Sequence, residues 1–250
     1  AIKVRKVLID KYPESEWSKR ALYLIGANFH ALAIYDTAAD YYEQFANKYP
    51  NEDGSKCTDA EKSAGTCAVA HEAMQNAIFF RLGLGDEARA VEDAKSFEKN
   101  YSRKFPRETS QVRYSLGSIY ERLQDWKRVV DHYTSYINQY KKTALPNELM
   151  QANVTVGRAY LAMLDKDKGA RQKADPYFRS AVKIWTEGGP DAIAKSDAPE
   201  EQKGRYLAFA KIAVAEALFY LANDDFEKFA QIGFPIFKST VKEKESAAKK

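Results

Sequence analysis

Apolar and aromatic residues recur along the chain at the spacing of amphipathic helices, and short polar turns separate one run from the next. In the run YDTAADYYEQFANKYP (35–50), Ala38, Tyr42 and Phe45 fall on one face of a helix. Further runs repeat this pattern, with Ala94 and Phe97 in one and Val129, Val130, Tyr133, Tyr136 and Ile137 in another. The helical period predicts an all-α protein.

One short motif recurs in the first half of the predicted units. An aliphatic residue precedes a glycine and an aromatic residue follows it by three positions, in Ile25-Gly26-Phe29, Leu116-Gly117-Tyr120 and Val156-Gly157-Tyr160. Glycine inside a helix costs about 1 kcal/mol relative to alanine. Its recurrence at one phase therefore predicts that a neighbouring helix passes too close for a Cβ, as in tight antiparallel hairpins.

The second half of each unit follows a short polar turn, found as YDTA, GDEA, LQDW and NDDF. Acidic residues at these turns favour helix N-termini, where backbone N–H groups lack partners. A proline is expected to end each unit because it cannot continue the helical hydrogen-bond ladder. The prolines concerned are Pro13, Pro50, Pro106 and Pro146.

Together these residues resemble the tetratricopeptide repeat family, whose pattern runs from a large residue and Leu-Gly to a terminal proline. The family's spacing is met best by Leu22, Ile25, Gly26, Phe29, Ala38, Tyr42 and Pro50. The match is good over 107–140, fair over 150–185 and weak over 71–105 and 205–231, and Gly169 departs from it. The resemblance implies a right-handed α-α superhelical solenoid of about five antiparallel helix hairpins.

The resemblance also divides the chain, which we expect to form one solenoid over 1–250 and to be a piece of a longer protein. The divisions are the end of a preceding repeat (1–15), a repeat (16–50), a Cys-containing insertion (51–70), a degenerate repeat (71–106), a repeat (107–146), a repeat with an insertion (147–190), a linker (191–204), a degenerate repeat (205–236) and a basic tail (237–250). The Tyr-Pro endings resemble those of bacterial periplasmic members in outer-membrane assembly, cell division and gliding. A periplasmic location, with outer-membrane association through other parts of the parent chain, is therefore expected.

Both cysteines of the chain, Cys57 and Cys67, lie in the insertion of small and polar residues. A local disulfide would close this loop and would imply an oxidising compartment. Two alternatives remain open at this point. The cysteines could be free thiols of a cytosolic protein, or they could bind a metal with His71, although a fourth ligand is missing.

Other chemical motifs are weak. GLGDEA matches a dinucleotide fingerprint but follows a helical run rather than a strand. DKDKG begins like a calcium loop, yet Gly169 comes one place early and Pro176 replaces the bidentate Glu. His30, His71 and His132 fall in separate units without a catalytic pattern. We therefore expect no enzyme, no cofactor and no metal.

Charge and hydropathy argue against nucleic acid and membrane as partners. The formal net charge is +4, and the last thirteen residues, with five Lys and two Glu, contribute +3 of it. The remaining body is nearly neutral and lacks the clustered cations that phosphates require. The most apolar run, YLAFAKIAVAEALFYLA (206–222), is interrupted by Lys211 and Glu216, so it predicts a buried helix and no membrane insertion.

Binding is expected in a concave groove lined by the first helices of the stacked hairpins. The helical face opposite the glycine seam gives the candidate residues Arg20, Tyr23, Ala27, His30, Phe80, Arg81, Tyr114, Ser118, Arg122, Thr155 and Arg158. Tyr and Arg are enriched in binding hot spots, although each residue could instead be ordinary surface or contact a neighbouring helix. The Lys and Asn clamp by which chaperone-binding members hold a carboxylate is absent at the matching positions Tyr23, Ala27, Ala73, Ala77, Tyr114 and Ser118.

The sequence therefore predicts a non-enzymatic scaffold that holds a peptide segment or protein partner in its concave groove. A bacterial cell-envelope complex is the expected setting. The alternative is a structural spacer or oligomerisation module, in which the aromatic-rich face packs against further repeats of a larger multi-repeat protein.

Overall fold

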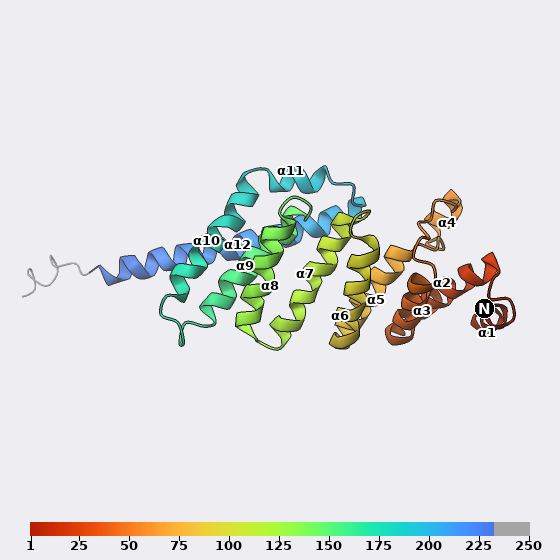
Figure 1. Cartoon of the computed structure of the whole chain (residues 1–250). Helices are drawn as coiled ribbons and strands as arrows, with labels where there is room; N and C mark the ends of the chain where they lie inside the picture. Colours follow the sequence, from red (N-terminus) through yellow and green to blue (C-terminus); the bar gives the residue numbers. More distant parts are fainter. Residues whose placement is uncertain (233–250) are drawn as a thin grey trace, which may run out of the picture.

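The structure, a computed structural model, describes residues 1–232 and contains twelve helices and no β-strand within that range (Figure 1). The predicted basic tail and the end of the last predicted repeat, residues 233–250, lie outside the described residues. The helices are α1 (Ile2–Lys11), α2 (Glu16–Ala31), α3 (Tyr35–Lys48), α4 (Asp59–Ser63), α5 (Ala70–Leu84), α6 (Glu87–Tyr101), α7 (Pro106–Arg122), α8 (Trp126–Tyr140), α9 (Pro146–Leu161), α10 (Ala170–Thr186), α11 (Gly189–Ala194) and α12 (Glu200–Gln231).

Four helical hairpins, α2–α3, α5–α6, α7–α8 and α9–α10, stand side by side along the molecule (Figure 1). Helix α1 lies beside the first hairpin, and α12 packs along α9 and α10 at the other end. Each hairpin buries its apolar stripe between its own helices and against the next hairpin. The fold is an all-α solenoid, as predicted.

The glycines of the recurring motif lie where the two helices of a hairpin meet. Each faces an aromatic ring from the second helix of the same hairpin: Gly26 faces Tyr42, Gly117 faces Tyr133 and Gly157 faces Phe178. A Cβ on Gly117 would lie 2.7 Å from the Tyr133 ring atom Cε2, closer than carbon atoms pack. The predicted close approach is confirmed, and the neighbour that requires it is a ring rather than a backbone.

Acidic residues cap the second helices of two hairpins, as the sequence predicts. Asp125 precedes α8, and its Oδ1 accepts a hydrogen bond from the Arg128 backbone N–H at 3.1 Å. Asp86 precedes α6 and accepts in the same way from Arg89, at 3.4 Å. These bonds satisfy N–H groups that have no partner within the helix.

The prolines do not all end helices. Pro50 follows α3 directly, after the capping residue Tyr49, whereas Pro106 and Pro146 are the first residues of α7 and α9. The prediction that Pro106 and Pro146 close their units is therefore wrong. The first turn of a helix has no hydrogen bond for proline to remove, and the fixed φ of proline suits that position.

The C-terminal region differs from the predicted linker and fifth hairpin. Helix α11 runs into the supposed linker, and its Ile193 is buried. Helix α12 runs unbroken through NDDF, where a turn was predicted. Turns in three of the hairpins contain a residue with positive φ, at Ala33, Gly85 and Gln124. No described residue near NDDF adopts that conformation, so the helix continues.

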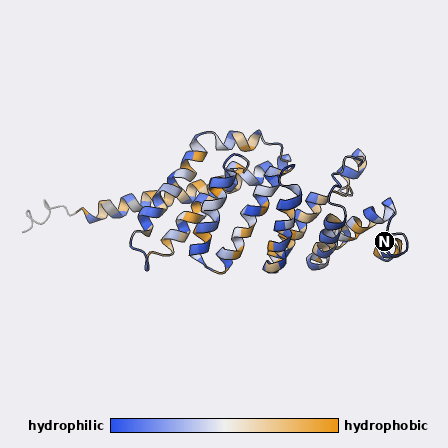
Figure 2. Cartoon of the chain, in the orientation of Figure 1, coloured by the Kyte–Doolittle hydropathy of each residue, from blue (hydrophilic) through white to orange (hydrophobic). Residues whose placement is uncertain are grey.

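Helix α12 is also less buried than its composition predicts. One side, with Ala210, Ala213, Val214 and Ala217, is buried, but several large apolar side chains on the other sides are exposed. Apolar residues continue along the part of α12 that projects past α10 (Figure 2). Within the described chain, α12 is long and apolar enough to cross a membrane, on length and composition alone.

Candidate functional site

Three of the predicted groove residues, Tyr114, Ser118 and Arg122, lie together on one face of α7. They are spaced by four residues, which places them one above another on a helix. With Phe79 and Leu82 of α5 they line a hollow of about 590 Å³ between the two first helices. We call it the Arg122 hollow. Its remaining lining residues are Gly83, Ser115, Glu121 and Tyr133.

Polar contacts hold two of these side chains in place. The Tyr114 hydroxyl donates to Gln151 Oε1 of α9 at 2.9 Å. Burial, and then the charges of Glu121 and Glu148, raise the pKa of Tyr114, so its hydroxyl stays protonated and remains a donor. The Arg122 guanidinium donates to the Leu82 carbonyl at 3.2 Å, lies 3.4 Å from Glu87 Oε1, and keeps 44% of its side chain exposed. A partner carboxylate or carbonyl can therefore reach it.

A second hollow, of about 720 Å³, adjoins the first through Phe79, which lines both. It lies between α5, α7 and the start of α12, and its lining is rich in amides: Gln75, Asn76, Gln111 and Gln202. We call it the amide hollow. An ion pair between Arg107 of α7 and Asp197, just before α12, joins two of its walls. The two hollows together form the α5–α7 groove.

One polar contact recurs between successive first helices of the hairpins. Gln75 of α5 donates to Gln111 Oε1 of α7 at 3.1 Å. At the equivalent position of the next pair of helices, Tyr114 of α7 donates to Gln151 Oε1 of α9. The two residues of this contact are 37 positions apart in the sequence, compared with 36 for the first contact. Gln111 and Gln151 each lie six residues before a motif glycine. The sequence analysis did not predict a role for these two glutamines. Their identical distance from the motif glycine was the signal that could have identified them.

Buried charge and packing remove three predicted residues from the groove surface. Arg81 is 2% exposed, and its Nε donates to Asp93 at 2.6 Å while Glu43 binds its other end. Tyr23 and Thr155 are buried as well, at 6% and 5% exposed. Their predicted place on an open binding surface is wrong. Arg81 lies five residues before Asp86, the N-cap of α6, just as Tyr120 lies five residues before Asp125, the N-cap of α8. Arg81 therefore occupies the position that an aromatic residue takes in the motif, and this position faces inward.

The other predicted residues lie apart from the α5–α7 groove. His30 and Phe80 pack edge to face at 4.7 Å, and Ala27 packs against the core beside them. Arg20 forms an ion pair with Glu61 of the insertion. Arg158 keeps 46% of its side chain exposed, but Nε lies 3.4 Å from Glu216 of α12.

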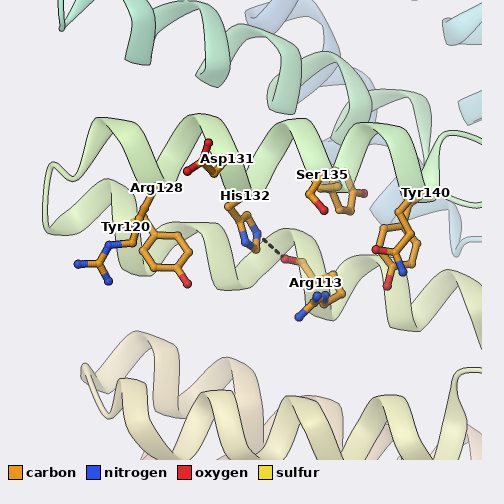
Figure 3. A pocket seen from close by; sticks show the side chains of 9 residues that line it. Arg113, Tyr120, Arg128, Asp131, His132, Ser135 and Tyr140 are labelled. Carbon is orange, nitrogen blue, oxygen red and sulfur yellow. Dashed lines mark hydrogen bonds between the residues drawn. The ribbon is translucent and has the colours of Figure 1, made fainter.

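A third hollow, of about 260 Å³, lies at α7 and α8 and shares no lining residue with the groove (Figure 3). In it His132 Nε2 donates to the Arg113 carbonyl at 2.9 Å, and burial lowers the pKa of His132. A neutral ring whose Nε2–H is bound to backbone has a structural role. Within residues 1–232 no cluster of His, Cys, Asp or Glu could hold a metal ion.

The insertion between the first two complete hairpins is closed by the predicted disulfide, Cys57–Cys67, with Cα atoms 5.7 Å apart. The short helix α4 lies inside the loop and begins with a capping box between Thr58 and Glu61. Lys19 of α2 pairs with Glu52 at 2.5 Å, where the chain enters the insertion. The loop is therefore tied to the first hairpin at more than one point.

Comparison with known proteins identifies one repeat. A family model described as tetratricopeptide repeat matches residues 20–52, which cover most of α2, all of α3 and the turn after it. A search of curated proteins finds no match to the chain.

Proposed function

We propose that the chain is a tetratricopeptide repeat protein that binds a peptide segment of a protein partner in the α5–α7 groove. The model of this family matches residues 20–52, and repeats of this family mediate protein–protein interaction. The recurring polar contact between successive first helices carries this proposal. The hollows on either side of Phe79 give room for a segment that crosses α5 and α7. The function proposed is that of a non-enzymatic scaffold.

The chemistry of the groove suits the backbone of an extended segment. An amide side chain has both donors and an acceptor, as a peptide group does, so Gln111 and Gln202, which line the amide hollow, can pair with peptide N–H and C=O groups. Phe79, 37% exposed between the two hollows, offers an apolar anchor. Arg122 adds a cation at one end, where an acidic side chain of the partner would bind.

The setting we propose is a bacterial cell-envelope complex in the periplasm, of the kind used in outer-membrane assembly, cell division or gliding. The Cys57–Cys67 disulfide supports an oxidising compartment, where such bonds form and persist. The Tyr-Pro endings of α1 and α3 add the resemblance to periplasmic members of the family.

Capture of the partner by immobilised chain from an envelope extract tests the groove. Phe79→Asp and Gln111→Leu should each lower recovery of the partner at least tenfold, because they remove the anchor and one amide of the groove. Matched controls are Leu123→Asp at the α7–α8 turn and Gln139→Leu in the third hollow, which should leave recovery unchanged. Equal recovery by all four variants, each with the melting temperature of the parent chain, would refute the groove as the binding site.

A further inference from the structure

Helix α12 presents a second apolar side, opposite the one that packs on α9 and α10. This side carries six exposed residues, which we call the α12 seam: Ala208, Ile212, Ala215, Phe219, Ala222 and Phe226. Ile212, Phe219 and Phe226 are 61%, 65% and 65% exposed. A helix that is apolar on both sides is usually buried on both sides. In the described residues of a single chain, however, this side of α12 is exposed to solvent.

The spacing of the seam is that of a coiled coil. Its residues follow one another by four, three, four, three and four positions, which is the alternation of heptad a and d positions. Large residues occupy every a position and alanine occupies every d position. The seam therefore has a regular alternation of large and small side chains along more than two heptads.

From this pattern we propose that the α12 seam binds the same seam of a second copy of this chain, with the two helices antiparallel. In that arrangement each large residue faces an alanine: Ile212 faces Ala222 of the second copy, Phe219 faces Ala215, and Phe226 faces Ala208. The pairing is complete, since all six residues find a partner of complementary size and none is left over. Packing of large against small side chains fills the space between helices without voids.

A parallel pair fits the same sequence poorly. It would place phenylalanine against phenylalanine in one layer and alanine against alanine in the next, which leaves voids beside the alanines. Two seams together offer on the order of 1,000 Å² of apolar surface, the size at which specific interfaces begin.

The packed side of α12 argues against a membrane as the occupant. Ala210, Ala213 and Ala217 are buried in a core shared with α9 and α10, and Glu216 lies 3.4 Å from Arg158. Insertion of α12 across a bilayer would break these contacts and place Lys211 and Glu216 in hydrocarbon. A second copy covers the exposed side and leaves the packed side unchanged.

Sedimentation of the purified chain from about 1 to 100 µM tests the proposal. We expect a concentration-dependent dimer that Phe219→Glu converts to monomer, weakening association at least a hundredfold. Leu123→Glu, an equally exposed apolar site outside α12, is the control and should still dimerise. A monomer throughout the range would overturn the proposal. So would a monomer that binds vesicles of phosphatidylethanolamine and phosphatidylglycerol through the seam.

Disulfide cross-linking tests the orientation. The chain has two cysteines, both in the Cys57–Cys67 bond, so an introduced cysteine is the one reactive thiol. Ile212→Cys and Ala222→Cys variants should cross-link when mixed, because the antiparallel pair places these positions opposite each other. Either variant alone should remain largely uncross-linked. Self-cross-linking of each variant would overturn the antiparallel arrangement, and it would leave the proposed groove function unaffected.

Discussion

Replacement of Gly117 by alanine isolates the close packing on which the hairpins depend. The new Cβ would lie 2.7 Å from Tyr133 Cε2, and Tyr133 is 2% exposed, so the ring has little space to move. The Tyr133 hydroxyl also donates to Glu121 Oε1 at 2.6 Å, and a displaced ring would lose this bond. The substitution thus combines overpacking with the loss of a hydrogen bond to a charged group.

The expected magnitude follows from three contributions. Overpacking costs about 1–3 kcal/mol, and the hydrogen bond to a carboxylate contributes about 1.5–3 kcal/mol if it breaks fully. Alanine returns about 1 kcal/mol through its higher helix propensity. Their midpoint, a net loss of about 3 kcal/mol in the free energy of unfolding, corresponds to a melting temperature lower by about 6–12 °C for a chain of this length.

Thermal unfolding followed by circular dichroism at 222 nm measures this effect. Gly204→Ala in α12 is the matched control, because no heavy atom other than those of its chain neighbours and its own helix backbone lies within 4 Å of the added Cβ. That control should raise the melting temperature, by about 2–4 °C at most, through helix propensity alone. If Gly117→Ala stabilises the chain as much as Gly204→Ala does, the close-packing account of the motif is wrong.

Three further predictions concern buried charge, pH and the disulfide. Asp93→Ala should lower the free energy of unfolding by about 3 kcal/mol in urea titrations, because it removes the most buried partner of Arg81. Burial raises the pKa of Glu148 to about 7; the folded chain therefore holds this proton more tightly than the unfolded chain, and Glu148 should lower stability by up to about 3 kcal/mol as pH rises from 4.5 to 7. Asp93, whose pKa burial raises to about 6, acts in the same direction. Glu148→Gln should flatten this dependence. Loss of the Cys57–Cys67 bond by double substitution to serine should cost about 2–3 kcal/mol in the same titrations.

Each of these has a contrary result. Asp93→Ala as stable as the parent chain would mean that Asp40, Glu43 and Asp86 together satisfy Arg81. An unfolding free energy that rises from pH 4.5 to 7 in the parent chain and not in Glu148→Gln would reverse the sign assigned to this carboxyl group. Unchanged stability of the serine variant would show that the insertion is held by its ion pairs instead of its disulfide.

The sequence was sufficient for the features that depend on local pattern. The phase of Gly26, Gly117 and Gly157 predicted the hairpins, because a helix accepts glycine at a fixed phase only where something crowds it. The isolation of Cys57 and Cys67 in one short loop predicted their bond. Both inferences use residues that are close in sequence or repeated at one period.

The features that depend on neighbouring helices could not be read in the same way. Arg81 looked like a groove cation, but acidic residues from α3 and α6 surround it, and only the fold brings them together. NDDF looked like a turn, but α12 runs through it without a residue at positive φ such as those in the turns at Ala33, Gly85 and Gln124. The pairing of Gln111 with Gln75 joins residues 36 positions apart, so the contact emerges only from the stacking of α5 on α7.

Site-specific photo-cross-linking tests the central claim, that a partner binds in the α5–α7 groove, most directly. A photoreactive amino acid at Ser118, exposed in the Arg122 hollow, is compared with the same group at Ser135, exposed in the third hollow. The account predicts a covalent adduct with one partner protein from position 118 and none from position 135, with the cross-linked site in a short continuous segment of that partner. Adducts from position 135 alone, or from both positions equally, would contradict it.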